Sequence, residues 1–220
     1  MVPGLTFALP KGRLFAPSLE ILKEAGLGRD GLDDGGRRLV FPDPERGIEY
    51  LVARASDVPT YVEYGAADLG IVGKDILMED RKDLYELLDL KFGFCRFVVA
   101  VPRERAGKEY AAGGGSLRVA TKFPRVAEEF FRGKGLSAEI IKLQGAVELA
   151  PRVGLAEVIV DLVSTGRTLR ENGLVEVEEI ARASARLVAN RVSFRMKSDC
   201  LAPVVEKLRR VVAAREEAGR

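Results

Sequence analysis

Short apolar runs alternate along this chain with segments in which apolar residues recur at helical spacing. Such alternation is typical of an α/β protein built from strand–helix–strand units. The apolar or β-prone runs that predict strands are 5–9, 38–41, 48–54, 68–72, 93–101, 117–121, 138–143, 157–162 and 175–192. The segments that predict helices are 14–25, 57–64 (capped by Ser56 or Asp57), 74–79, 124–132, 146–152, 168–171 and 202–217.

The order of these elements predicts two lobes. A first α/β unit is followed by a charged, glycine-rich tract at 103–116, which predicts a surface loop, and a second α/β unit then begins. The long β-prone runs at 93–101 and 175–192 are candidates for two crossings between lobes. This organisation resembles the two-lobed periplasmic-binding-protein-like folds, in which ligands occupy the cleft between the lobes. We expect residues 1–93 with 185–220 to form the first lobe, including a closing helix, and residues 94–184 the second.

Composition narrows the possible chemistry. The 220 residues contain 35 basic and 33 acidic side chains, a net charge of only +2, so nucleic acid is not an expected partner. Histidine is absent, which excludes histidine-dependent triads, zinc–histidine sites and histidine acid–base catalysis. Cys95 and Cys200 fit no metal-binding spacing. With no secretory leader and no membrane-length apolar run, the expected compartment is the cytoplasm, without membrane association.

The most informative stretch joins a buried strand to a hydroxyl-rich turn. Asp161 stands near the end of the predicted strand 157–162, and the turn 164–168 reads Ser-Thr-Gly-Arg-Thr before a predicted helix. The first turn of a helix has unpaired backbone N–H groups and favours anions, so this turn could bind a phosphate. Gly166 would allow close backbone approach, and Asp161 could accept hydrogen bonds from sugar hydroxyls. The competing interpretation is an ordinary capped helix.

A longer motif around this stretch resembles the signature of ATP phosphoribosyltransferase, the first enzyme of histidine biosynthesis. Nine constrained positions within 22 residues match it: Glu148, Gly154, Ala156, Ile159, Asp161, Thr165, Gly166, Thr168 and Leu169. The larger group of phosphoribosyltransferases has two adjacent acids before its phosphate loop, whereas this chain has Val160 beside Asp161. The resemblance spans most of residues 5–195.

Two segments of the first lobe support the same resemblance. Lys11, Gly12 and Arg13 form a basic turn after the first strand, and ligands of open α/β sheets bind where strands end. The segments 54–62 and 67–75 are similar to other stretches of the family, with Ala55 where many relatives have a bulkier residue or proline. Alone, each segment could be a surface turn or a capped helix.

The resemblance implies transfer of the 5-phosphoribosyl group of 5-phosphoribosyl-1-pyrophosphate (PRPP) to N1 of ATP, with release of pyrophosphate. The first lobe would bind ATP and the second PRPP. The implied catalytic residues are Asp161, Lys11 and Arg13. The implied PRPP-binding residues are Glu148, Asp161, Ser164, Thr165, Gly166, Arg167 and Thr168. The implied ATP-binding residues are Lys11, Gly12, Arg13, Arg54, Asp68, Gly70 and Gly73. Substrate-bound Mg²⁺ is the expected cofactor, with its ligands left open.

Chain length implies a partner. Long members of the family have a further regulatory domain, but only about 28 residues follow Val192 here. The chain therefore resembles the short form, expected to be a homodimer joined by a regulatory subunit similar to histidyl-tRNA synthetase. Two alternatives remain open: a two-lobed small-molecule binding module without catalysis, and a phosphoribosyltransferase that uses another base.

Overall fold

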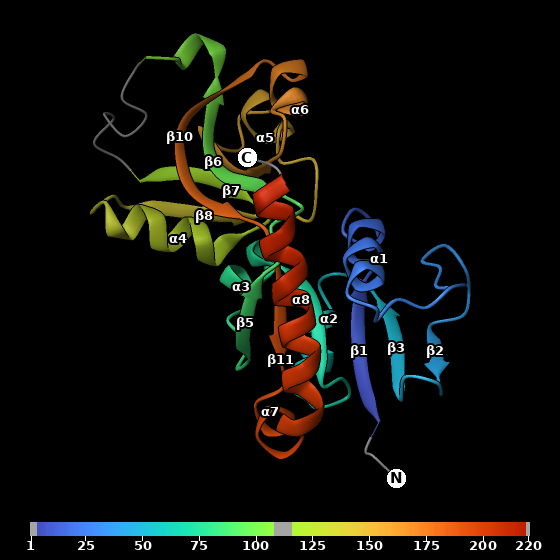
Figure 1. Cartoon of the computed structure of the whole chain (residues 1–220). Helices are drawn as coiled ribbons and strands as arrows, with labels where there is room; N and C mark the ends of the chain where they lie inside the picture. Colours follow the sequence, from blue (N-terminus) through green and yellow to red (C-terminus); the bar gives the residue numbers. More distant parts are fainter. Residues whose placement is uncertain (1–3, 108–115, 219–220) are drawn as a thin grey trace. The chain divides into compact units, whose positions relative to one another are not determined.

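The computed structural model describes residues 4–107 and 116–218 (Figure 1). The chain divides into two units: unit 1 consists of Met1–Gly93 and Ser184–Arg220, and unit 2 of Phe94–Ala183. The backbone passes between them twice, at Gly93–Phe94 and at Ala183–Ser184. Within the described ranges, no helix combines the length and apolar character that a membrane crossing requires.

Unit 1 is built on a six-stranded sheet of order β2-β3-β1-β4-β11-β5. β1 runs parallel to β3 and β4, whereas β2, β11 and β5 are antiparallel to their neighbours. The strands are β1 (Leu5–Pro10), β2 (Val40–Asp43), β3 (Ile48–Ala53), β4 (Leu69–Gly73), β5 (Tyr85–Asp89) and β11 (Ala185–Ala189). The helices are α1 (Phe15–Glu24), α2 (Val58–Glu63), α3 (Lys74–Asp80), α7 (Arg191–Met196) and α8 (Ser198–Ala218).

The two faces of this sheet have separate cores. On one face, α1 and α8 pack over side chains that include Phe7, Leu9 and Tyr50. On the other face, α2 contributes Val58 and Val62 to a smaller cluster. β1 and β4 are covered on both faces, which explains why their sequences read as nearly continuous apolar runs.

Unit 2 contains a five-stranded sheet of order β10-β6-β9-β7-β8. β7 runs parallel to β8 and β9, and β6 is antiparallel to β9 and β10. Its elements are β6 (Cys95–Pro102), β7 (Leu117–Thr121), α4 (Pro124–Gly133), β8 (Ala138–Lys142), α5 (Leu149–Arg152), β9 (Val158–Val163), α6 (Arg167–Glu171) and β10 (Leu174–Ala183), with a 3-10 turn at Arg103–Arg105. α4 covers one face of the sheet, while Ala150 and Leu169 bring α5 and α6 onto the other.

The β-prone run 175–192 proves to be two strands and the start of a helix. β10 ends at Ala183, and β11 begins at Ala185 in the other unit. Ser184 between them is buried; its hydroxyl donates to Asp89 (2.7 Å) and its carbonyl accepts from the backbone N–H of Lys74 (2.9 Å). These distant partners redirect the chain, and neighbouring sequence does not reveal them.

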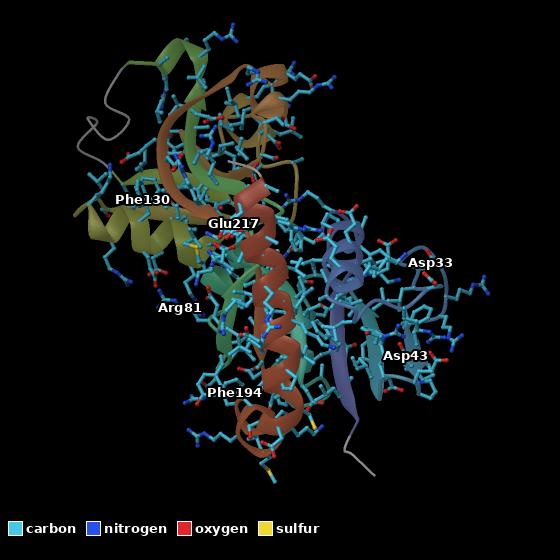
Figure 2. All side chains as sticks on the ribbon, viewed as in Figure 1. Asp33, Asp43, Arg81, Phe130, Phe194 and Glu217 are labelled. Carbon is cyan, nitrogen blue, oxygen red and sulfur yellow. The ribbon has the colours of Figure 1, made fainter. Side chains whose placement is uncertain are left out.

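Two elements of unit 1 were not expected from sequence. β5 is a short edge strand without clear alternation of buried and exposed residues. α7 begins after Asn190, whose Oδ1 accepts from the backbone N–H groups of Val192 (3.0 Å) and Ser193 (2.8 Å). Phe194 of α7 (Figure 2) lies edge-on to Tyr85 of β5, with ring centroids 5.2 Å apart. The predicted loop 103–116 falls largely outside the described residues.

Candidate functional site

In unit 2, the candidate site centres on Asp161 in β9. Asp161 lies opposite Val98 of the antiparallel strand β6, on the face that packs against α5 and α6. Burial raises the pKa of Asp161 to about 6, and the charge of Glu148 adds to this rise. A hydrogen bond with the Leu162 backbone and the charge of Lys122 oppose it. A carboxyl group held partly desolvated beside a second acid is typical of a functional site.

The predicted PRPP residues cluster around this carboxyl. Glu148 immediately precedes α5, which follows β8, and its charge acts on Asp161. β8 runs parallel to β7, which runs parallel to β9, so the segments that follow these strands leave the same edge of the sheet. The loop 164–168 follows β9 directly and leads into α6. The structure thus brings Glu148, Asp161 and the loop together in one unit.

The loop has an exposed hydroxyl side and a buried glycine. Ser164, Thr165 and Thr168 are exposed, whereas Gly166 is buried and has φ +72°. The carbonyl of Thr165 accepts from Arg170 Nη1 (3.1 Å), and that of Thr168 accepts from Asn172 Nδ2 (2.9 Å). With these carbonyls held by side chains, the hydroxyl groups and the amides of the first helical turn are available for an anion. Arg167 is exposed and pairs with Glu171 (2.7 Å).

In unit 1, the basic turn follows β1 at the edge where β1 and β3 end. The backbone N–H of Lys11 donates to Ala53 O (2.7 Å), which fixes the turn to the end of β3. Gly12 has φ +82°, and its N–H donates to Asp34 Oδ2 (2.8 Å). Arg13 Nη1 donates to the carbonyl of Gly93 (3.1 Å). This edge therefore presents two cations beside a turn whose positive φ favours glycine.

Lys11 and Arg54 line a pocket of about 410 Å³ at this edge. Tyr61 and Asp57 of the α2 region also line it, and the remaining walls are largely aliphatic: Leu39, Val40, Leu51, Val52 and Ala53. Aliphatic and aromatic walls beside two cations match a flat heterocycle that carries anionic groups. A larger pocket of about 660 Å³ lies at the opposite ends of β1 and β3, lined by Leu5, Ile48 and Lys207 among others, and contains none of the motif residues.

Asp68 does not join this cluster. It precedes β4, and its Oδ2 accepts from the backbone N–H of Thr6 (2.9 Å) and from Lys197 Nζ (2.9 Å). Thr6 lies near the beginning of β1, so Asp68 is at the edge of the sheet opposite Lys11. The structure thus gives this buried carboxylate partners at the far edge of the sheet, away from Lys11 and Arg54.

The two glycines of β4 have different surroundings. A Cβ at Gly70 would lie 2.8 Å from Val62 and 2.9 Å from Val58, so this glycine allows α2 to pack against the sheet. Its role is close packing and not nucleotide contact. Gly73 ends β4 on the same edge as Lys11, and a Cβ there would lie 2.0 Å from Asp75 Oδ1. Only Gly73 remains beside the candidate nucleotide site.

Four residues of the unit 2 site were missed from sequence: Arg96, Lys122, Arg170 and Glu176. Lys122 follows β7, next to the position paired with Val160, and its charge lowers the pKa of Asp161. Arg96 and Glu176 form an ion pair between β6 and β10. Arg96 and Glu176 are far apart in the sequence, so the sequence does not reveal their contact. Of the four residues, only Lys122 could have been found from the pattern, as a basic residue directly after a predicted strand.

Comparison with known proteins identifies relatives of the whole chain. The sequence model of the ATP phosphoribosyltransferase family matches residues 54–210. An ATP phosphoribosyltransferase of Moorella thermoacetica is 60% identical over 210 residues, covering 94% of this chain and 92% of the relative. The solved ATP phosphoribosyl transferase (HisG:HisZ) complex from Thermotoga maritima has a chain 36% identical to this one, with TM-score 0.80 and coverage of 96% and 99%.

A more distant structural likeness concerns the fold alone. The periplasmic aliphatic sulphonate binding protein SsuA from Escherichia coli is 14% identical, with TM-score 0.60, covering 98% of this chain and 74% of that protein. This likeness confirms the predicted α/β, periplasmic-binding-protein-like fold class.

Proposed function

The chain belongs to the ATP phosphoribosyltransferase family, and from this premise we propose how its residues divide the work of the reaction. The protein is a pentosyl transferase: it transfers the 5-phosphoribosyl group of PRPP to N1 of ATP, the first step of histidine biosynthesis. The alternatives of a non-catalytic binding module and of a transferase for another base are therefore set aside.

In this proposal, unit 2 binds PRPP. The loop 164–168 holds the 5-phosphate through its amides and hydroxyl groups, and Asp161 accepts hydrogen bonds from the ribose hydroxyls. The observation that carries the proposal is the partly desolvated Asp161 carboxyl, which is affected by the charge of Glu148 and stands in the strand that leads into this loop. When the bond from C1 to pyrophosphate breaks, positive charge develops on the ribose, and the ionised Asp161 stabilises it. Glu148 adds negative potential on the same side.

Unit 1 binds ATP in this proposal. Lys11 and Arg54 at the rim of the 410 Å³ pocket would face the triphosphate, and Tyr61 with the aliphatic walls would contact the adenine. Gly12, Arg13 and Gly73 shape the same edge. N1 of adenine already carries a lone pair, so the attack on C1 needs no strong base. Lys11 and Arg13 would counter the charge of the two polyanionic substrates.

We propose that Mg²⁺ arrives bound to the substrates. Among the described residues, no cluster of three or more cysteine, aspartate or glutamate side chains could form a protein cage for a metal ion. Mg²⁺ typically keeps phosphate and water ligands in such sites, which suits delivery by pyrophosphate or triphosphate oxygens. The bound ion would ease the departure of pyrophosphate.

We also propose a homodimer that assembles with a regulatory subunit similar to HisZ, and a cytoplasmic location. The solved relative from Thermotoga maritima is described as a HisG:HisZ complex, which supports such a partner. Neither Cys95 nor Cys200 forms a disulfide within the described ranges of the chain, which supports a reducing compartment. Size-exclusion chromatography with light scattering, alone and with a candidate partner, tests the assembly.

A single assay tests the catalytic assignment. The purified chain, with and without a regulatory partner, is incubated with PRPP, ATP and Mg²⁺, and the ultraviolet change of N1-substituted adenine is recorded. We expect Asp161→Asn to retain PRPP binding while turnover falls by at least about 10². Unchanged turnover of a folded Asp161→Asn protein would contradict the role of this carboxylate.

A further inference from the structure

The glycine of the phosphate loop lies against a carboxylate. A Cβ built on Gly166 would be 2.8 Å from Glu176 Oε1 and 3.0 Å from Arg170 Nη1. Both atoms are the ends of flexible side chains that lie close to the glycine and would have to shift to admit a larger residue. An anion this close to a loop that binds phosphate is unfavourable unless a cation compensates its charge.

Arg96 provides that compensation. Its Nη1 donates to Glu176 Oε2 in an ion pair that joins β6 to β10. Arg96 also lies opposite Val163, two residues after Asp161 on β9, at the point where the strand enters the loop. The side chains of Arg96 and Glu176 are 33% and 26% exposed, so solvent screens the pair only in part.

We propose that the Arg96–Glu176 pair positions the phosphate loop and that Arg96 cancels the charge of Glu176 beside the bound 5-phosphate of PRPP. This inference rests on the proposed function, because it requires the loop 164–168 to hold that phosphate. Both residues act through the loop and its electrostatic potential, so they are positioning residues and not catalytic ones. The Arg96–Glu176 pair itself carries no net charge, so Arg170 is left as the positive group beside Gly166.

Arg96 and Glu176 should have opposite effects on PRPP affinity, and this difference in sign is the test. Arg96→Gln removes the cation that is paired with Glu176 and leaves that carboxylate less compensated beside the loop, so we expect PRPP to bind at least about tenfold more weakly. Glu176→Gln keeps Arg96 and an amide of the same shape under Gly166, so we expect PRPP to bind more tightly, by up to about tenfold. The double variant should return to within about threefold of the unmodified protein, because neither charge remains.

The measurements are PRPP dissociation constants by calorimetry at two salt concentrations, and steady-state kinetics with each substrate. We expect the change to appear in KM for PRPP, with KM for ATP unaffected, and to shrink at high salt. The Arg118–Glu157 pair is the matched control, since it joins β7 to the residue before β9 at the other end of these strands. Arg118→Gln should leave PRPP affinity unchanged.

A purely structural pair would give a different result. If Glu176→Gln weakened PRPP binding as much as Arg96→Gln, or if the double variant showed no recovery, the inference would be wrong. Thermal unfolding identifies any variant that fails to fold. If a single variant fails to fold, the PRPP affinity of the double variant still tests the inference, because the double variant carries no unpaired charge. Gly166→Ala separates this inference from the proposed function. Unaltered PRPP binding by Gly166→Ala would overturn the assignment of the phosphate loop itself. Weaker PRPP binding by Gly166→Ala, together with unaltered binding by the Arg96 and Glu176 variants, would overturn only this inference.

Discussion

Asp161 and Glu148 bring two carboxyl groups to the same end of unit 2, one in β9 and one directly before α5. Burial is the main cause that raises the pKa of Asp161 to about 6, and the charge of Glu148 raises it further. The protonation of Asp161 near neutral pH therefore depends on its burial and on the charge of Glu148. The pH dependence of the enzyme should therefore report on Asp161.

The acid limb of the rate profile should follow Asp161. The ionised carboxylate stabilises positive charge on the ribose, so kcat/KM for PRPP should fall as pH decreases through about 6. Glu148→Gln removes a like charge, which lowers the pKa of Asp161 and moves this limb to lower pH. Lys122→Gln removes a favourable charge and should move it to higher pH. Profiles that shift in the same direction for both variants would contradict this electrostatic account.

Ionisation of Asp161 should also reduce stability. Its folded-state pKa of about 6 lies above the ordinary value of 3.8, so the stabilisation from binding a proton is complete below about pH 4 and lost as pH rises through 6. Asp161→Asn cannot ionise and should exceed the unmodified protein in free energy of unfolding at pH 8, by at most about 3 kcal/mol. Denaturant unfolding at pH 4.5 and pH 8 measures this, and the gain should largely disappear at the lower pH.

Gly166 should be required for PRPP binding, because its φ is positive and its neighbours leave little room for a side chain. Gly166→Ala incurs about 1–2 kcal/mol of backbone strain at positive φ and displaces Glu176 and Arg170. We expect a tenfold or greater loss of PRPP affinity, at a cost of about 1.4 kcal/mol per tenfold. Gly173→Ala is the matched control: it has φ +73° but no neighbour within 4 Å of the added Cβ. It should lose similar stability and keep PRPP binding, which calorimetry and thermal unfolding would show.

The elements around Asp161 in unit 2 can be predicted from the sequence because the residues that define them are neighbours in the chain. The strand that ends after Asp161 and the loop at Gly166 occupy consecutive positions, and local pattern fixes both. The sequence does not reveal the contacts of Asp68 and Gly70, because their partners, Lys197 and α2, come from elsewhere in the chain. The division of the run 175–192 at Ser184 likewise depends on contacts with Asp89 and Lys74. Periodicity does not encode such distant contacts.

Asp68 should matter for stability and not for catalysis. Asp68 is 3% exposed, and its carboxylate accepts hydrogen bonds from Lys197 and from the N–H of Thr6. Asp68→Asn should lower the free energy of unfolding by about 1–3 kcal/mol, since it leaves a charged partner poorly satisfied. Turnover per folded molecule and KM for ATP should be retained. A large rise in KM for ATP, with stability unchanged, would restore Asp68 to the nucleotide site.

The nucleotide pocket should depend on Tyr61 more than on its neighbour Tyr64. Tyr61 lines the 410 Å³ pocket beside Lys11 and Arg54, whereas Tyr64, at the end of α2, is 81% exposed and does not line it. Loss of an aromatic contact with a base typically costs about 1–3 kcal/mol. We therefore expect Tyr61→Ala to raise KM for ATP by about tenfold or more, with KM for PRPP unaltered, and Tyr64→Ala to change neither constant. Equal effects of the two substitutions on KM for ATP would mean that adenine binds outside this pocket.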